Sequence, residues 1–141
     1  MTREPIYSAL FSLLQNAANF TTVSRKLKHW SDVSQNQQPA IFMAQRDEMA
    51  ITQTGQPTVW TLHVDVYIYA HSNDPNQSAA PQINALLDAV VAALSGPNDN
   101  RQTLGGLVHY ARVDGKIQTD EGWLGEQSIA VIPIQIKIST A

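Results

Sequence analysis

Hydrophobic and polar residues alternate through one long stretch, residues 58–71, which reads TVWTLHVDVYIYAH. Side chains of a β-strand point alternately to its two faces, so this stretch predicts a strand with one apolar face. The apolar face carries Trp60, Leu62, Val64, Val66 and Ile68. The opposite face carries His63, Asp65, Tyr67, Tyr69 and His71. This second row mixes titratable and aromatic side chains, and its role is the main question that the sequence raises.

Two other segments have the spacing of amphipathic helices. We expect the first helix to run from about Glu4 to Ala18, with Pro5 in its first turn. Its apolar stripe consists of Ile6, Leu10, Leu13, Leu14 and Ala17. The second helix is expected to begin near Pro81 and to end at Gly96 and Pro97. Its apolar stripe consists of Ile83, Leu86, Leu87, Val90, Val91 and Leu94.

Four further runs are rich in β-branched or aromatic residues and predict strands. They are residues 20–30 (FTTVSRKLKHW), 37–45 (QQPAIFMAQ), 107–113 (LVHYARV) and 127–139 (QSIAVIPIQIKIS). Asp114 and Gly115 predict a turn, and residues 119–126 (TDEGWLGE) are expected to be irregular. Pro133 cannot donate a ladder hydrogen bond, so it predicts an edge or a bulge in the last strand.

Residues 46–57 are expected to form a long loop between the second strand and the alternating one. The segment combines charged residues with Gly55 and Pro57. We expect it to be mobile in the free subunit and ordered in an assembly, because fixing its backbone without contacts is costly. Met49 and Ile51 are apolar residues within it, and they would supply the compensating contacts.

These elements predict an α+β fold in the order α-β-β-β-α-β-β. A chain of 141 residues with 43% hydrophobic residues suits one domain, residues 1–141. Two amphipathic helices and a mostly antiparallel sheet each have one apolar face to bury. We therefore expect both helices to pack on one face of the sheet.

Composition narrows the classes of function. The chain has no cysteine, which excludes disulfides, thiolate metal sites and cysteine nucleophiles. Its formal net charge is −3, and its one basic cluster, Arg25, Lys26 and Lys28, is small for a nucleic-acid surface. We interpret that cluster as a solvated strand face. We expect neither a signal peptide nor a membrane span, because Glu4 and Pro5 precede the first apolar positions and no long apolar run occurs.

No motif predicts catalysis. His63 and Asp65 are about 6.5 Å apart on a strand and His71 is eight residues from His63, which is poor spacing for one metal ion. The chain has no Gly-x-Ser-x-Gly motif, and TLGG at residues 103–106 lacks the Gly-Lys-Ser/Thr ending of a phosphate loop. The pairs at 47–48 and 120–121 are acidic but lie in expected loops. We expect no catalytic residue, metal ligand or cofactor site.

Two interpretations of the polar row are open. Tyrosine and histidine combine apolar bulk with a polar end, which suits a surface that is wet in the monomer and covered in an assembly. The alternative is an ordinary solvated sheet face with cross-strand aromatic pairs. On the first interpretation, the candidate interface with another subunit or a tube consists of Met49, Ile51, His63, Asp65, Tyr67 and Tyr69.

Five stretches in order along the chain resemble the tail terminator (tail-completion) proteins of long-tailed bacteriophages, of the minor tail protein U type. They are SRKLKHWSDVSQNQQPAIFM, VWTLHVDVYIYAH, INALLDAVVAAL, TLGGLVHYARVDGKI and IAVIPIQIKI, and they cover most of the chain. The resemblance implies helices packed on one side of a sheet and a homo-oligomer, a hexameric ring.

By this resemblance the ring caps the finished tail tube, stops its polymerisation and meets the head-tail connector or neck protein. It would have no catalytic activity, would assemble in the bacterial cytoplasm and would remain in the virion. DNA would pass through without specific binding, which the acidic balance suits. Two alternatives are open: another neck or head-closure protein of the same assembly, and a small enzyme or ligand-binding α+β domain.

Overall fold

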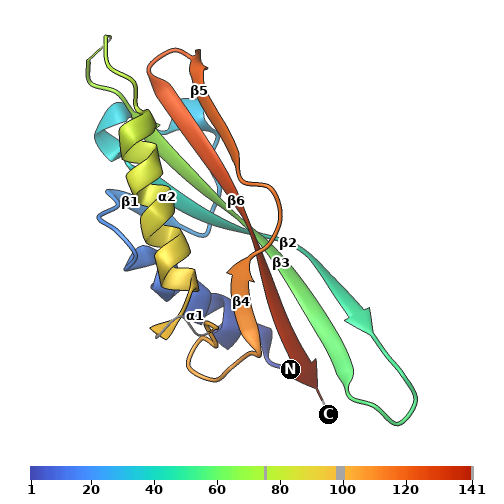
Figure 1. Ribbon diagram of the computed structural model, residues 1–141. Coiled ribbons are helices and arrows are strands. Elements are labelled where there is room, and N and C mark those ends of the chain that lie inside the picture. Colours follow the sequence, from blue (N-terminus) through green and yellow to red (C-terminus); the bar gives the residue numbers. More distant parts are fainter. Residues whose placement is uncertain (75, 98–100, 141) are drawn as a thin grey trace.

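The computed structural model describes residues 1–74, 76–97 and 101–140, and it has two helices and a six-stranded sheet (Figure 1). The helices are α1 (Arg3–Gln15) and α2 (Ala80–Leu94). The strands are β1 (Thr22–Ser24), β2 (Ala40–Ile51), β3 (Thr58–His71), β4 (Tyr110–Val113), β5 (Gln118–Leu124) and β6 (Gln127–Thr140). The α+β class and the order α-β-β-β-α-β-β are confirmed, with β5 as an additional strand before the last one.

Strands β3 and β6 form the centre of the sheet, whose order is β1-β2-β3-β6-β4. Strand β5 pairs with the first half of β6, and β4 pairs with its second half. Only the short β1–β2 pair is parallel among the strand pairs of the described residues. The sheet is therefore mostly antiparallel, as predicted.

Both helices pack on one face of the sheet and bury the main core against it (Figure 1). Helix α1 contributes Ile6, Tyr7, Leu10 and Leu14, and α2 contributes Ile83, Leu86, Val90 and Leu94. The apolar row of β3 faces them, with Leu62, Val64, Val66 and Ile68 fully buried. The alternating pattern thus gives the face that each β3 side chain occupies. We call the opposite face, which neither α1 nor α2 covers, the far face.

Several element boundaries differ from the prediction. Helix α1 ends at Gln15 rather than Ala18, because the backbone leaves the helical conformation at Asn16 (φ −93°, ψ 0°) and Ala17 N–H bonds to Leu14, three residues back, instead of four. The run 20–30 forms only the three-residue strand β1. The run 107–113 is a strand only from Tyr110, since residues 103–108 form a turn closed by Val108 N–H bonding to Thr103.

Two predicted irregular segments are strands instead. Residues 119–124, expected to be irregular, belong to β5, which pairs with β6 with a register shift between Glu121 and Leu124. The expected loop at 46–57 is also wrong over its first half, because β2 continues to Ile51. A bulge between Gln45 and Asp47 inserts Arg46, and pairing with β3 resumes at Asp47 opposite His63. Only residues 52–57 connect the two strands.

Pro133 lies where the neighbour of β6 changes. Strand β4 pairs with β6 up to Ile134, and β5 begins opposite Val131. The carbonyl of Pro133 accepts a hydrogen bond from Asp114 N–H in the turn between β4 and β5. Strand β6 is central, yet at Ile132 and Pro133 no strand pairs with it on that side. A residue without an N–H is tolerated there because no ladder bond is lost.

None of the helices in the described residues is long and apolar enough to cross a membrane.

Candidate interaction surface

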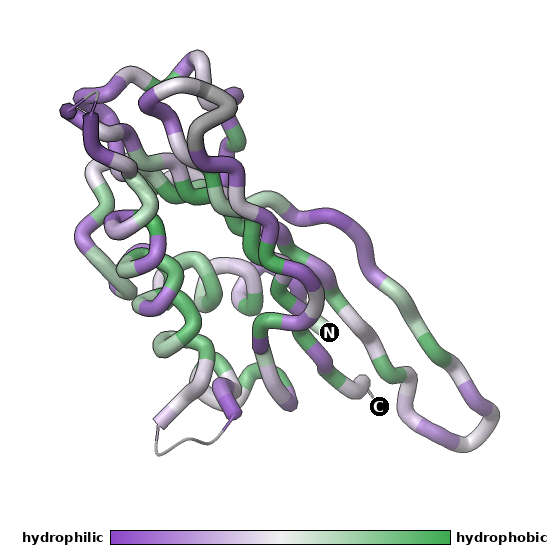
Figure 2. The backbone as a smooth tube through the Cα atoms, turned by 45° about the horizontal axis from the view of Figure 1, so that its top comes forward, coloured by the Kyte–Doolittle hydropathy of each residue, from purple (hydrophilic) through white to green (hydrophobic). Residues whose placement is uncertain are grey.

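The far face of the sheet divides into three zones along β3. Near the C-terminal end of β3, the segment between β1 and β2 covers a small apolar cluster. In the middle a belt of charged side chains is exposed. Beyond the bulge, the β2–β3 hairpin continues as a ribbon that we call the hairpin extension, residues 46–61. Figures 1 and 2 show its end reaching beyond both helices, with hydrophobic positions along it.

Tyr69 belongs to the apolar cluster rather than to an exposed interface. Its side chain is 3% exposed, and its hydroxyl donates a hydrogen bond of 2.6 Å to the carbonyl of Lys28. Burial raises the pKa of Tyr69 to about 12, with a smaller contribution from Tyr67. The cluster consists of Val33, Ala40, Phe42 and Tyr69, with Trp30, Tyr67 and Ile129 packed against it. The prediction of Tyr69 as an interface residue is therefore wrong, because its own chain folds back over it.

His63 and Asp65 lie in the charged belt and each has a partner on the hairpin. His63 Nδ1 lies 2.5 Å from Asp47 Oδ1, and Arg46 Nη1 lies 3.3 Å from Asp65 Oδ1. The bulge makes both contacts possible, since it brings Arg46 and Asp47 to the same face. A shallow hollow beside these residues is also lined by Asp114, Gly115 and Lys116. The belt is an internally paired, half-exposed charge network.

His71 takes no part in that network. It is eight positions from His63 on the same strand, a distance of roughly 26 Å. Its Nε2 atom lies 3.8 Å from Glu126 Oε2. Within the described residues, no group of three histidine, aspartate or glutamate side chains is arranged to hold a metal ion.

Met49 and Ile51 are among the most exposed large apolar side chains of the described residues, at 56% and 51%. They pair with Thr61 and Val59 of β3, so both lie on the far face, as His63 does. A hollow next to Ile51 is lined by the β2–β3 turn and by β6. The outer edge of β2 is also open here, because β1 pairs only with residues 40–42. An exposed strand edge with apolar side chains is typical of a contact site.

Glu48 fixes the base of the hairpin extension to α1. Its carboxylate accepts a 2.9 Å hydrogen bond from the Tyr7 hydroxyl and a 2.8 Å bond from Arg3 Nε. Burial, followed by the contact with Glu48, raises the pKa of Tyr7 to about 12. The guanidinium of Arg3 also lies 5.2 Å from the Trp60 ring centroid. These contacts attach the base of the hairpin extension to α1.

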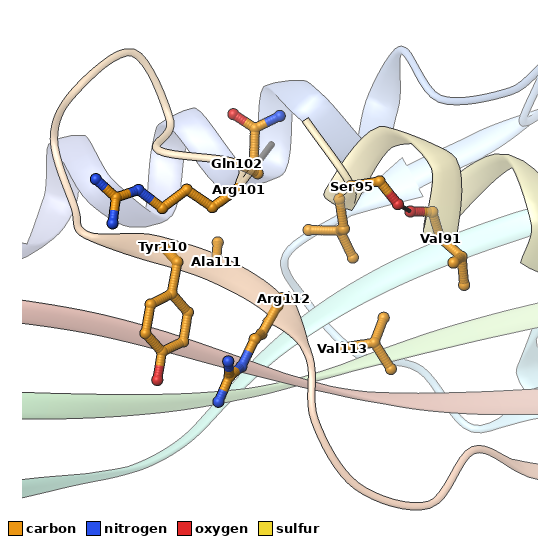
Figure 3. A pocket seen from close by; sticks show the side chains of 9 residues that line it. Val91, Ser95, Arg101, Gln102, Tyr110, Ala111, Arg112 and Val113 are labelled. Carbon is orange, nitrogen blue, oxygen red and sulfur yellow. Dashed lines mark hydrogen bonds between the residues drawn. The ribbon is translucent and has the colours of Figure 1, made fainter. Parts of the chain in front are cut away.

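A second candidate surface lies at the opposite edge of the sheet, between α2 and β4. This α2–β4 groove has a volume of about 570 Å³. Figure 3 shows Val91 on α2, Ser95 directly after the end of α2, and Tyr110, Arg112 and Val113 on β4. Its remaining lining residues are Leu94, Arg101, Gln102 and Ala111. The guanidinium of Arg112 lies 4.2 Å from the ring centroid of Tyr110.

Sequence reasoning located part of these surfaces. Met49, Ile51, His63 and Asp65 do lie on one face, and Tyr67 is partly buried beside the apolar cluster. The basic cluster is divided: Arg25 bonds to Glu4 and Gln45, whereas Lys26 and Lys28 are exposed. The contact of Glu48 with α1 and the α2–β4 groove were not predicted from the sequence. No signal in the sequence indicated the groove, because Val91, which is 39% exposed, has the same stripe spacing as the buried residues of α2.

No protein-family model matches the chain, and no curated protein matches it either.

Proposed function

We propose that the protein is the terminator of a long bacteriophage tail. Copies of it form a closed ring, hexameric by the resemblance described above, at the end of the finished tail tube. The ring stops tube polymerisation and offers a surface to the head-tail connector or neck protein. It carries out no catalytic step, DNA passes through it without specific binding, and it remains in the virion.

The hairpin extension is the observation that carries this proposal. Strands β2 and β3 have 12 and 14 residues, about twice the usual length, and their far end is not covered by either helix. Met49 and Ile51 are more than half exposed there, beside an open strand edge. Such a projection supplies contact area for a neighbouring subunit or for the tube at little cost to the domain core.

The polar hollows support a structural rather than a catalytic role. The hollow beside His63 and Asp65 is open, and each of the two side chains already contacts a hairpin residue, His63 contacting Asp47 and Asp65 contacting Arg46. The two tyrosines whose pKa values are raised to about 12, Tyr7 and Tyr69, are both buried in the fold and hydrogen-bonded.

The test is a measurement of solution mass across concentration, combined with electron microscopy of assembled tails. We expect the mass to rise from monomer towards a closed ring as protein concentration increases or when tail tubes are added. Labelled protein should appear as a ring at one end of each tube. A strict monomer at high concentration, together with tubes that carry no ring of this protein, would refute the proposal.

A further inference from the structure

Each chain exposes apolar side chains at two opposite edges of its sheet. The hairpin extension, at the β2 edge, exposes Met49 and Ile51, and the α2–β4 groove, at the β4 edge, exposes Val91. Strands β3 and β6 separate β2 from β4 in the sheet. One chain cannot therefore cover its own groove with its own hairpin extension.

The groove is preformed. The side-chain amide of Gln102 donates a 3.0 Å hydrogen bond to the backbone carbonyl of Ala93 in α2. The backbone carbonyl of Gln102 accepts a 2.8 Å hydrogen bond from the backbone N–H of Ala111 in β4. This residue therefore links the two walls. A groove that is already shaped loses less conformational entropy when a partner binds.

The charges of the two surfaces are opposite. The groove lining contains two arginines, Arg101 and Arg112, and no acidic residue. In the hairpin extension Glu48 is bonded to α1 and Arg46 lies beside Asp65. Asp47 lies on the same face as Met49 and Ile51, and its side chain is 61% exposed. Opposite charge at the rim of an apolar contact favours correct pairing and disfavours contact between two like surfaces.

We propose that the hairpin extension of one copy docks in the α2–β4 groove of the next copy. Met49 and Ile51 pack against the apolar wall that includes Val91 and Val113. Asp47, which lies on the same face as Met49 and Ile51, faces Arg101 at the rim of the groove. This inference rests on the proposed function, because it assigns the contact that closes the ring. A contact between two different surfaces of the same chain is head-to-tail, and its repetition gives a ring if the rotation closes.

The absence of cysteine from the chain allows a direct test by disulfide trapping. Met49→Cys and Val91→Cys are introduced together into the full chain. Ile51→Cys with Val91→Cys is a second pair, which tests a contact two residues further along the same face of β2. Under oxidation we expect at least one pair to give a ladder of covalent multimers that reductant reverses. The multimer yield should be at least about tenfold above that of the control. The control combines Met49→Cys with Asn84→Cys, which is exposed at the other end of α2.

Native mass spectrometry of the unmodified protein separates the two proposals. If closed rings form but neither cysteine pair exceeds the control, the docking contact is wrong and the proposed function stands. If the ladder forms but no closed ring appears with or without tubes, the docking contact stands and the ring is wrong. If Met49→Cys alone gives an equally strong dimer, the hairpins meet each other and the docking contact is wrong. Monomers without any cross-link refute both.

Discussion

At the scale of single residues, the hydroxyls of two buried tyrosines bond to segments that are distant in the sequence. Tyr7 bonds to Glu48 at the base of the hairpin extension, and Tyr69 bonds to the carbonyl of Lys28 in the segment over the far face. Burial raises the pKa of each to about 12. Both groups are neutral and donate their hydrogen bonds at neutral pH.

These tyrosines predict loss of stability in alkali. An unfolded tyrosine ionises near pH 10, whereas Tyr7 and Tyr69 hold their protons to about pH 12 in the folded chain. Their contribution is therefore complete below about pH 10 and is lost as the pH rises through about 12. We expect the stability difference between the wild type and Tyr7→Phe or Tyr69→Phe to shrink by roughly 2 kcal/mol between about pH 9 and about pH 11.5. Urea unfolding at each pH measures it, and a constant difference would contradict the assignment.

His63 and Asp65 are expected to bind no metal ion. His63 is engaged by Asp47 and Asp65 by Arg46, so binding a cation would break two existing contacts. Calorimetric titration with zinc or manganese at neutral pH should therefore show no tight stoichiometric site. His63→Ala is the matched variant, and tight binding that this variant loses would overturn the prediction.

At the scale of elements, the hairpin extension is a strand pair that exposes two large apolar side chains, Met49 and Ile51. Its base is fixed by Glu48, Arg3 and Trp60, and its outer strand edge is open beyond residue 42. The extension is therefore a strand pair attached to the domain at its base and not a free loop. Its far end contributes little to the core.

The double variant Met49→Ser and Ile51→Ser should separate folding from assembly. Both side chains are more than half exposed, so we expect the free energy of unfolding to change by less than about 1 kcal/mol. Burial of both against a neighbour is worth roughly 3–6 kcal/mol before ordering costs, so assembly should weaken at least about tenfold. Urea unfolding and sedimentation measure the two effects.

Leu27→Ser is the control for this variant, because Leu27 is also exposed, at 41%, but lies outside the extension. It should leave assembly unchanged. If the double variant unfolds, the extension is needed for the fold, and if it assembles as the wild type does, the extension is not the contact.

At the scale of the whole molecule, the charge balance bears on the passage of DNA. The chain has 12 acidic and 9 basic residues, and four of its arginines pair with carboxylates of the same chain, namely Arg3, Arg25, Arg46 and Arg112. Few cationic side chains are left to release counterions from a phosphate backbone. A ring of such subunits would repel DNA weakly.

We therefore expect no specific binding of double-stranded DNA at physiological salt, with an affinity weaker than about 10⁻⁴ M. Fluorescence anisotropy of a labelled duplex across a salt series measures this for the monomer and for the assembled ring. Micromolar binding with a steep salt dependence would show that the ring holds the DNA.

The sequence by itself determined the two helices, the face occupied by each β3 side chain and the α+β class. These features depend on local periodicity, because an apolar stripe or an alternating row has to meet a core wherever the rest of the chain lies. Four residues of the apolar row of β3 are buried accordingly, as are the stripe residues Ile6, Leu10, Ile83 and Val90. The position of Met49 and Ile51 outside the core also followed from their polar surroundings.

Only the tertiary structure decided which segments cover one another. The charges at 46–48 predicted a loop, but partners distant in sequence, Arg3, His63 and Asp65, keep that segment in a strand. Tyr69 is buried because residues 28–33 fold over it, and Val91 is exposed because no described element covers that side of α2. Such outcomes depend on contacts between residues tens of positions apart, and local periodicity does not encode them.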